Sequence, residues 1–190
     1  GELEVPSDRN FSSERFLIDL KKAEGETGYI YLDTLDKPTS GIGHLLTEDE
    51  LKRYNVDKTR YKDIKLKNGV TVPVLLDKNG NPLVSSNSDR EAWINNDTKT
   101  AIEAAQKQAK MLGITDGKFI EGLGKVSYQL GANWWNKDVN PNAHQNTWQL
   151  LMDGKYKEAA EEAKNSKWFE QTKPRVEEFA NMLKEYNDTL

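Results

Sequence analysis

Residues 24–44 read EGETGYIYLDTLDKPTSGIGH, and this stretch decides the fold of the first half of the chain. Residues 12–23, just before it, begin with a serine pair that can cap a helix, and apolar side chains follow at helical spacing. Gly25 ends that helix, and the runs 29–31 and 40–43 predict two short strands around a turn. We therefore expect the end of a helix to lead directly into a β-hairpin.

Two Ser/Thr-x-x-Glu patterns mark further helix starts, because the two side chains of such a capping box satisfy each other's backbone N–H groups. The box at Thr47 predicts a short helix. The box at Ser88 predicts a long helix over residues 88–112, which ends at Gly113.

After residue 112, nearly every stretch has the spacing of a helix, and turn-forming residues separate the stretches. The predicted helices cover residues 119–135, 142–153, 155–164 and 174–187, with Pro174 in a first helical turn. Four tryptophans are expected in the core, although the adjacent pair cannot both face one side of a helix: Trp93, Trp134, Trp135 and Trp148.

These elements predict an α+β fold with two lobes. A small β-containing N-terminal lobe covers about 11–87, a linking helix about 88–112, and a helical C-terminal lobe about 113–190. Residues 1–10 are expected to form a loose tail. Two lobes on one helix leave a cleft between them, which is a usual place for a ligand site.

Composition excludes several classes of protein. The chain has no cysteine, which rules out disulfides and thiol catalysis. Its net charge is −4 and no Lys/Arg cluster has interleaved aromatics, so we expect no nucleic-acid partner. His44 and His144 lie far apart without a metal-binding pattern, so we expect no metal and no other cofactor. No run approaches the ~20 apolar residues of a membrane span, and the start lacks the pattern of a signal peptide.

The two acids of the opening stretch have two interpretations. Glu24 closes a helix, where the helix dipole and partial burial both favour the protonated form that a general acid needs. A solvated terminal Glu is the plainer and commoner alternative. Asp33 can be the acceptor of an Asx-turn, and Thr39 an ordinary strand residue. The sharper alternative is glycoside hydrolysis, in which one carboxylic acid protonates the leaving oxygen and a second carboxylate activates a water.

The ordered pattern Glu24-Gly25, Asp33-Thr34 and Thr39-x-Gly41-x-Gly43-His44-Leu45-Leu46-Thr47 resembles the phage lysozymes of the T4 type, with the same internal spacing. The resemblance resumes after residue 88. There, the segments QLG at 129–131 and SKWFEQTKPR at 166–175 are similar to further family segments. The resemblance covers most of the chain and implies a lysozyme-like fold, with residues 1–190 as a single domain.

By this resemblance the chain is a muramidase, which cuts the β-1,4 bond between N-acetylmuramic acid and N-acetylglucosamine in peptidoglycan with inversion. Glu24 is then the general acid, while Asp33 and Thr39 position and activate the water. In an inverting enzyme the two carboxyls should lie about 6.5–9.5 Å apart. Two alternatives remain open: a lytic transglycosylase with 1,6-anhydro products, and a catalytically silent wall-binding or tail-structural module. The presence of all three motif residues argues against both.

Other residues take supporting roles by the same resemblance. His44 is expected to form a structural ion pair with Asp97 rather than to act as a base. Arg175 is expected to face Glu24 across the cleft. The residues expected to bind substrate are Gln129, Trp168, Leu45 and Gly43.

The chain departs from the family pattern between residues 49 and 87, and Ser40 stands where an aliphatic residue is more usual. We expect an inserted hairpin over about 55–87, with strands in 70–84 around an Asn-Gly turn at 79–80. Pro73 favours an edge strand there. The insert is expected to contact the stem peptides of the substrate or a phage tail or accessory protein, or else to be a tolerated surface insertion.

The remaining expectations concern where the protein works. We expect a monomer, made in the cytoplasm of a phage's host, that acts on the bacterial cell wall or periplasm. The net charge of −4 gives no general attraction to an anionic wall, which would suit a module that another protein delivers.

Overall fold

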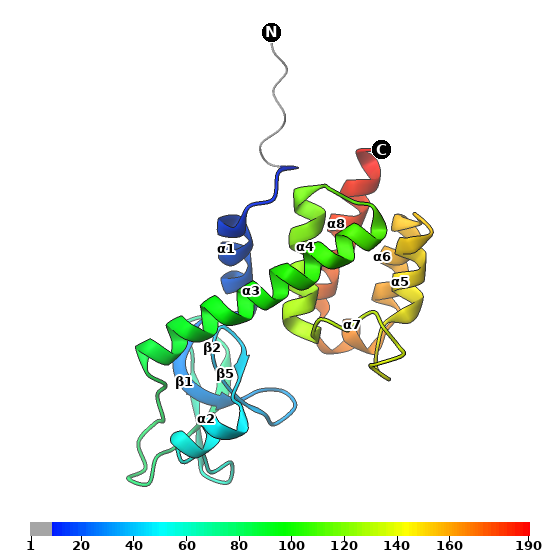
Figure 1. Cartoon of the computed structure of the whole chain (residues 1–190). Helices are drawn as coiled ribbons and strands as arrows, with labels where there is room; N and C mark the ends of the chain where they lie inside the picture. The colour runs from blue at the N-terminus through cyan, green and yellow to red at the C-terminus, as the bar shows by residue number, and fades with distance from the viewer. Residues whose placement is uncertain (1–8) are drawn as a thin grey trace. The chain divides into compact units, whose positions relative to one another are not determined.

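A computed structural model describes residues 9–190 of the chain (Figure 1). The chain forms two compact units, which we call the N-terminal unit, Ile18–Asp97, and the C-terminal unit, Thr98–Leu190 with residues 9–17. Their boundaries fall inside helix α1, Ser13–Glu24, and helix α3, Asn87–Leu112. The α+β prediction is confirmed, because the strands belong to the first unit and most of the helices to the second. The predicted lobe boundaries, the single domain and the cleft stay predictions.

The N-terminal unit is built on a five-stranded antiparallel sheet with the order β3-β2-β1-β5-β4 (Figure 1). Its strands are β1 Thr27–Leu32, β2 Pro38–Gly41, β3 His44–Leu45, β4 Tyr61–Lys65 and β5 Thr71–Leu75, and helix α2 covers Glu48–Arg53. β1 is the central strand, and one of its residues, Tyr31, is paired with Thr39 of β2 and with Val74 of β5. The buried core of the unit consists of Ile30, Leu32, Leu46, Leu75 and Trp93.

The inserted segment joins this sheet, but its hairpin differs from the predicted one. β4 and β5 pair around a turn at 66–70, whereas the turn at 77–81 closes only a short ladder, with the bridge between Leu76 and Pro82 and a bond from the N–H of Leu83 to the carbonyl of Leu75 at 2.8 Å. Pro73 lies in β5, an inner strand, so its predicted edge position is wrong. The missing N–H is tolerated because β1 pairs with β5 at the single register position Tyr31–Val74.

The end of the inserted segment and Ser40 are both bonded into the sheet. Backbone N–H groups donate from Ile30 to Leu83 at 2.9 Å and from Ser85 to Gly28 at 2.9 Å. The buried hydroxyl of Ser40 lies 2.7 Å from the hydroxyl of Ser85. Ser40, which stands where an aliphatic residue is more usual, therefore has a polar partner, Ser85, at the end of the inserted segment.

Helix ends follow local capping, with two corrections to the predicted boundaries. The Thr47 box is confirmed, but α3 begins at Asn87 because Ser86, not Ser88, accepts the N–H of Asp89 at 3.0 Å. Helix α4, Gly117–Leu130, ends before residue 135 because Gly131 takes φ 97°, which a side chain disfavours.

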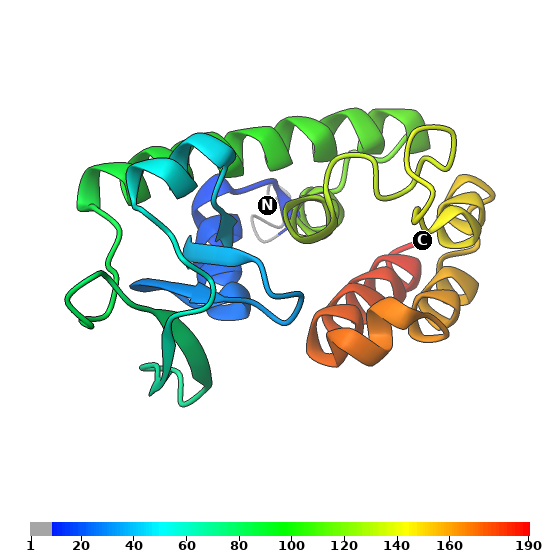
Figure 2. The same cartoon turned by 90° about the horizontal axis from the view of Figure 1, so that it is seen from below.

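In the C-terminal unit, the five helices that follow α3 in the described chain pack around an apolar core. Two of them, α6 and α8, lie side by side (Figure 2). Besides α4, the five helices include α5 Gln145–Met152, α6 Tyr156–Lys164, α7 Lys167–Gln171 and α8 Lys173–Asp188. Trp134 and Trp148 are buried in this core as predicted, and Trp93 is buried in the other unit. Trp135 is only partly buried, because both residues of the pair lie in the turns after α4 rather than on a helix.

The chain just before α1 is anchored to the C-terminal unit by two bidentate ion pairs. Arg9 donates to both oxygens of Asp116 at 2.7 Å, so the loose tail predicted for 1–10 is wrong at its end, while residues 1–8 lie outside the described chain. Arg15 donates to both oxygens of Glu121 at 2.7 and 2.5 Å. Glu121 is nearly fully buried, so its charge depends on these bonds.

We predict that Arg15→Met lowers the free energy of unfolding by about 3 kcal/mol, because it leaves the Glu121 carboxylate buried without its cation. Denaturant unfolding of the purified protein measures this loss. The double variant Arg15→Met/Glu121→Leu should recover most of the loss, since no charge is then buried. A double variant no more stable than the single one would contradict this account of the pair.

Candidate active site

Glu24 is the last residue of α1, and its carboxylate lies against the turn between β2 and β3. A Cβ atom on Gly43 would lie 2.8 Å from Glu24 Oε1, which is closer than real Cβ contacts. Gly43 also takes φ 72°, which a side chain disfavours. Glycine at position 43 therefore lets the carboxylate of Glu24 approach the backbone of this turn.

Asp33 holds the turn that follows β1. Its Oδ1 accepts the N–H groups of Leu35 at 2.8 Å and of Lys37 at 2.9 Å, which is the Asx-turn expected of such a residue. Within residues 9–190 no hydrogen bond is made to Oδ2. One carboxylate oxygen therefore fixes the side chain, and the other remains an acceptor.

Thr39 lies in β2 and is buried. Its hydroxyl donates to the carbonyl of Lys37 at 2.9 Å, which fixes its direction and leaves the lone pairs of the oxygen as acceptors. Lys37 thus binds both Asp33, through its N–H, and Thr39, through its carbonyl. This one residue couples the positions of the carboxylate and the hydroxyl.

Tyr31 is the residue at this site that the sequence analysis missed. It stands opposite Thr39 across the β1–β2 ladder. Burial first, and then the negative charges of Glu24 and Asp33, raise the pKa of Tyr31 to about 12. The phenol is thus close enough to feel both carboxylates, and it stays protonated at neutral pH. The alternation of polar and apolar residues along β1 could have drawn attention to Tyr31, although aromatic strand residues are common in any sheet.

His44 forms the centre of a hydrogen-bond network with two carboxylates. Its Nδ1 lies 2.6 Å from Asp97 Oδ2, the contact that the sequence predicts, and its Nε2 lies 2.8 Å from Glu50 Oε1. The ring also stacks on Trp93, whose indole N–H donates to Glu50 at 2.6 Å. Sequence analysis missed Glu50, because its place in the Thr47 capping box already explained it.

Burial alone would lower the pKa of His44, but hydrogen bonds and charge interactions with Asp97 and Glu50 outweigh burial and raise it above 6.5. For Glu50, burial raises the pKa, yet the hydrogen bonds from His44, Thr47 and Trp93 make the net shift a lowering. The network therefore favours an imidazolium between two carboxylates, a structural arrangement with both ring nitrogens engaged.

The predicted residues of the C-terminal unit bond to one another within it. Trp168 Nε1 donates to Gln129 Oε1 at 3.0 Å, and Gln129 Nε2 donates to Thr172 at 2.9 Å. Arg175 donates to the carbonyl of Lys125 at 3.2 Å. In the N-terminal unit, the side chain of Leu45 is exposed on β3. The substrate-binding roles of these residues, and the role of Arg175 opposite Glu24, stay predictions.

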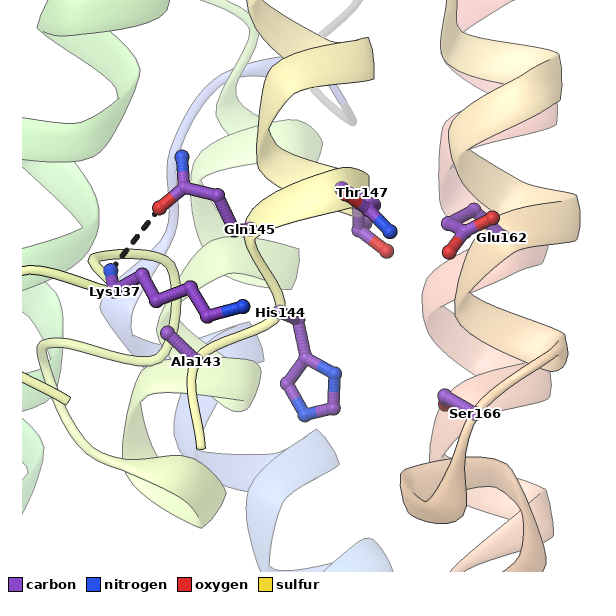
Figure 3. Close-up of a pocket in the computed structure, with 8 residues that line it drawn as sticks. Lys137, Ala143, His144, Gln145, Thr147, Glu162 and Ser166 are labelled. Atoms are coloured by element: carbon purple, nitrogen blue, oxygen red, sulfur yellow. Dashed lines mark hydrogen bonds between the residues drawn. The ribbon is translucent and has the colours of Figure 1, made fainter. Parts of the chain in front are cut away.

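The C-terminal unit also has a small polar pocket, where Lys137, His144 and Thr147 lie on one side and Glu162 and Ser166 on the other (Figure 3). Its volume is about 150 Å³, which is below the ~300–1,000 Å³ of typical ligand pockets. None of the predicted site residues lines it, although His144 contacts the ring of Trp168. We assign it no role in the site.

Among residues 9–190, no three His, Asp or Glu side chains come together so as to hold a metal ion. No helix of the described chain has the length and apolarity needed to cross a membrane.

The raised pKa of His44 predicts how stability changes with pH. The contribution of His44 is complete below about pH 6.5, the pKa in the unfolded chain, and is lost as pH rises through the folded pKa. Thermal melts at pH 6.5–9 should therefore show a falling melting temperature for the wild type and a flatter profile for His44→Asn. His144 does not confuse the comparison, because burial lowers its pKa and its effect lies below about pH 6.5. Parallel profiles for the two proteins would contradict the network.

Comparisons with known proteins identify the family. No protein-family model matches the chain. It is 30% identical over 176 residues to a probable T4-type lysozyme 2 of Dictyostelium discoideum, covering 88% of this chain and 95% of the relative. A probable T4-type lysozyme 1 of the same organism is 28% identical, with 80% and 84% covered. The peptidoglycan hydrolase gp36 of Pseudomonas phage phiKMV is 33% identical over 98 residues, 51% of this chain and 10% of that protein. The chain therefore belongs to the T4-type lysozymes and is a glycoside hydrolase.

Proposed function

We propose that the protein hydrolyses the β-1,4 bond between N-acetylmuramic acid and N-acetylglucosamine in bacterial peptidoglycan, with inversion at the anomeric carbon. The observation that carries this proposal is the grouping of Glu24, Asp33 and Thr39 around Tyr31. Two carboxylates and a fixed hydroxyl are the groups that an inverting glycosidase needs, with one acid for the leaving oxygen and a base for the water.

Glu24 is the general acid in this proposal. Its protonated carboxyl gives a proton to the glycosidic oxygen as the bond to the anomeric carbon breaks. Its position as the last residue of α1 places the carboxyl group against the turn between β2 and β3. The backbone at Gly43, which the carboxylate approaches closely, limits the directions that it can take.

Asp33 and Thr39 bind the water in this proposal. Asp33 Oδ2 accepts one proton of the water, while the Thr39 oxygen accepts a hydrogen bond from the other. The water oxygen attacks the anomeric carbon from the face opposite the leaving group, so the configuration inverts. Asp33 takes up the proton and returns it to solvent, and Glu24 is protonated again. Because the Asx-turn already holds Asp33, little ordering remains to be done when the water binds.

The cell wall is the proposed place of action, because peptidoglycan, which the name of the similar phage hydrolase gives as its substrate, is the proposed substrate here. We propose that the protein is made in the cytoplasm of a phage's host and reaches the wall from there. A phage tail or accessory protein as partner, and the monomeric state, stay predictions.

We predict that Glu24→Gln lowers the rate of lysis of bacterial walls by about 10²–10⁴-fold, because the amide cannot donate the catalytic proton. The rate of turbidity loss of a wall suspension measures this. Glu26→Gln is the matched control: it makes the same change two residues away, at an exposed side chain that pairs with Lys21. Equal rates for wild type and Glu24→Gln would remove Glu24 from the role of acid.

A second prediction concerns the glycine beneath the acid. Gly43→Ala should lower kcat by about 10²-fold, because its Cβ would displace the Glu24 carboxyl from the productive position. The control is Gly80→Ala, since Gly80 also has a positive φ, 83°, but has no atom within 4 Å of an added Cβ. Both variants strain the backbone, and thermal melts measure that effect. If both lost activity equally at equal stability, the contact between Gly43 and Glu24 would not matter.

A further inference from the structure

The turn between β4 and β5 lies next to the proposed acid. A Cβ atom added to Gly25 would lie 3.1 Å from Asn68 Nδ2, and Gly25 is the residue that follows Glu24. Residues 66–70 form this turn, closed by a backbone bond from the N–H of Leu66 to the carbonyl of Val70 at 2.8 Å. The inserted segment therefore brings a turn within one residue of Glu24.

The position of this turn is fixed by the sheet. β5 is paired with β1 at Tyr31, the residue that feels the charges of Glu24 and Asp33. β4 is paired with β5 over its whole length and forms the edge of the sheet. The turn is thus held by the same framework as the proposed catalytic groups, and it is visible at the end of the hairpin in Figure 2.

The inserted segment has the opposite charge to the rest of the chain. Residues 55–87 contain six Lys or Arg and three Asp, a net charge of +3, which leaves −7 for the remaining residues. Lys65 and Lys67 flank the start of the turn at 66–70, and both side chains are exposed. Within residues 9–190, neither ammonium group forms an ion pair. Two exposed lysines outside any ion pair therefore lie close in sequence to Asn68, whose side chain approaches Gly25, in a protein whose remaining residues carry a net negative charge.

The substrate of the proposed function has anionic groups at the matching position. The stem peptide branches from the muramic acid, one of the two sugars at the bond that Glu24 would protonate, and it carries free carboxylates. When the substrate is bound, a carboxylate close to the scissile bond lies next to the protein surface beside Glu24. Ammonium groups bind carboxylates by charge-assisted hydrogen bonds, and the Asn68 amide can donate to the same group.

We propose that Lys65, at the end of β4, and Lys67 and Asn68, on the turn at residues 66–70, form a binding site for the carboxylates of peptidoglycan stem peptides. This inference rests on the proposed function, since it places the muramic acid at Glu24. The turn selects glycan strands that still carry peptides and contributes to binding rather than to the chemical step. It gives local attraction to the wall, which the net charge of −4 does not supply.

The chain offers a matched control for this proposal. β5 is five residues long, so its two ends lie about 13 Å apart. Lys78 lies in the turn at the far end of β5, and Lys58 lies two residues before Arg60, which bonds to Leu76 at that same end. Lys58→Gln/Lys78→Gln therefore removes the same charge from the insert as Lys65→Gln/Lys67→Gln, at a distance from Glu24.

The experiment measures kcat and KM on intact sacculi and on glycan strands from which an amidase has removed the peptides. Lys65→Gln/Lys67→Gln should raise KM on sacculi about five-fold, with kcat within about two-fold of wild type. On peptide-free strands it should match the wild type, and the far-end control should match it on both substrates. The KM difference on sacculi should shrink as salt is added, because exposed charges are screened.

Three outcomes would overturn the proposal. Equal effects on both substrates would mean that the lysines act on sugar or through general charge. Equal effects of the two double variants would mean that position does not matter. If Lys65→Gln/Lys67→Gln left KM on sacculi unchanged, the two lysines would not bind stem peptides, and a protein partner would be the better explanation of the insert. Pelleting with sacculi in the Glu24→Gln background separates this test from that of the catalytic mechanism, because lysine-dependent binding is measured there without hydrolysis.

Discussion

The N-terminal unit depends on the pairing of one strand, β1, with neighbours on both sides. Through Tyr31, β1 is paired with Thr39 on one side and with Val74 of the inserted segment on the other. The helix that ends in Glu24 leads into this strand, and the turn that holds Asp33 leads out of it. Because the strand is central, the positions of the proposed acid, the proposed water-binding groups and the insert are set together rather than separately.

Charged side chains form two separate groups in the N-terminal unit, one around Tyr31 of β1 and one around His44. A partly buried phenol, which is protonated at neutral pH, lies close to both proposed catalytic carboxylates and adds no charge there. Away from it, His44 bonds to two further carboxylates and takes no part in the proposed chemistry. A histidine that closes the motif shared with the family can thus serve the structure, here by joining β3, α2 and α3 through Asp97, Glu50 and Trp93.

Sequence patterns predicted most of the helices and the turn at Asp33, because these depend on contacts close in sequence, whereas the roles of the site residues rest on the family resemblance and stay predictions. The capping box at Thr47, the end of α1 and the Asx-turn at Asp33 are local features. The errors concern contacts between distant segments. The sequence could not show that β5 pairs with β1, which places Pro73 in an inner strand, or that Tyr31 lies near two acids. Trp134 fitted helical spacing, yet Gly131 ends α4 before it.

The central claim is that Asp33 and Thr39 direct a water to the face opposite the bond that Glu24 protonates. The most direct measurement is NMR of the first product formed from a short, defined peptidoglycan glycan. The account predicts a new reducing end that appears first as the α-anomer, because the β-bond is inverted by one displacement. A product that appears first as the β-anomer, or that ends in a 1,6-anhydro sugar, would contradict it.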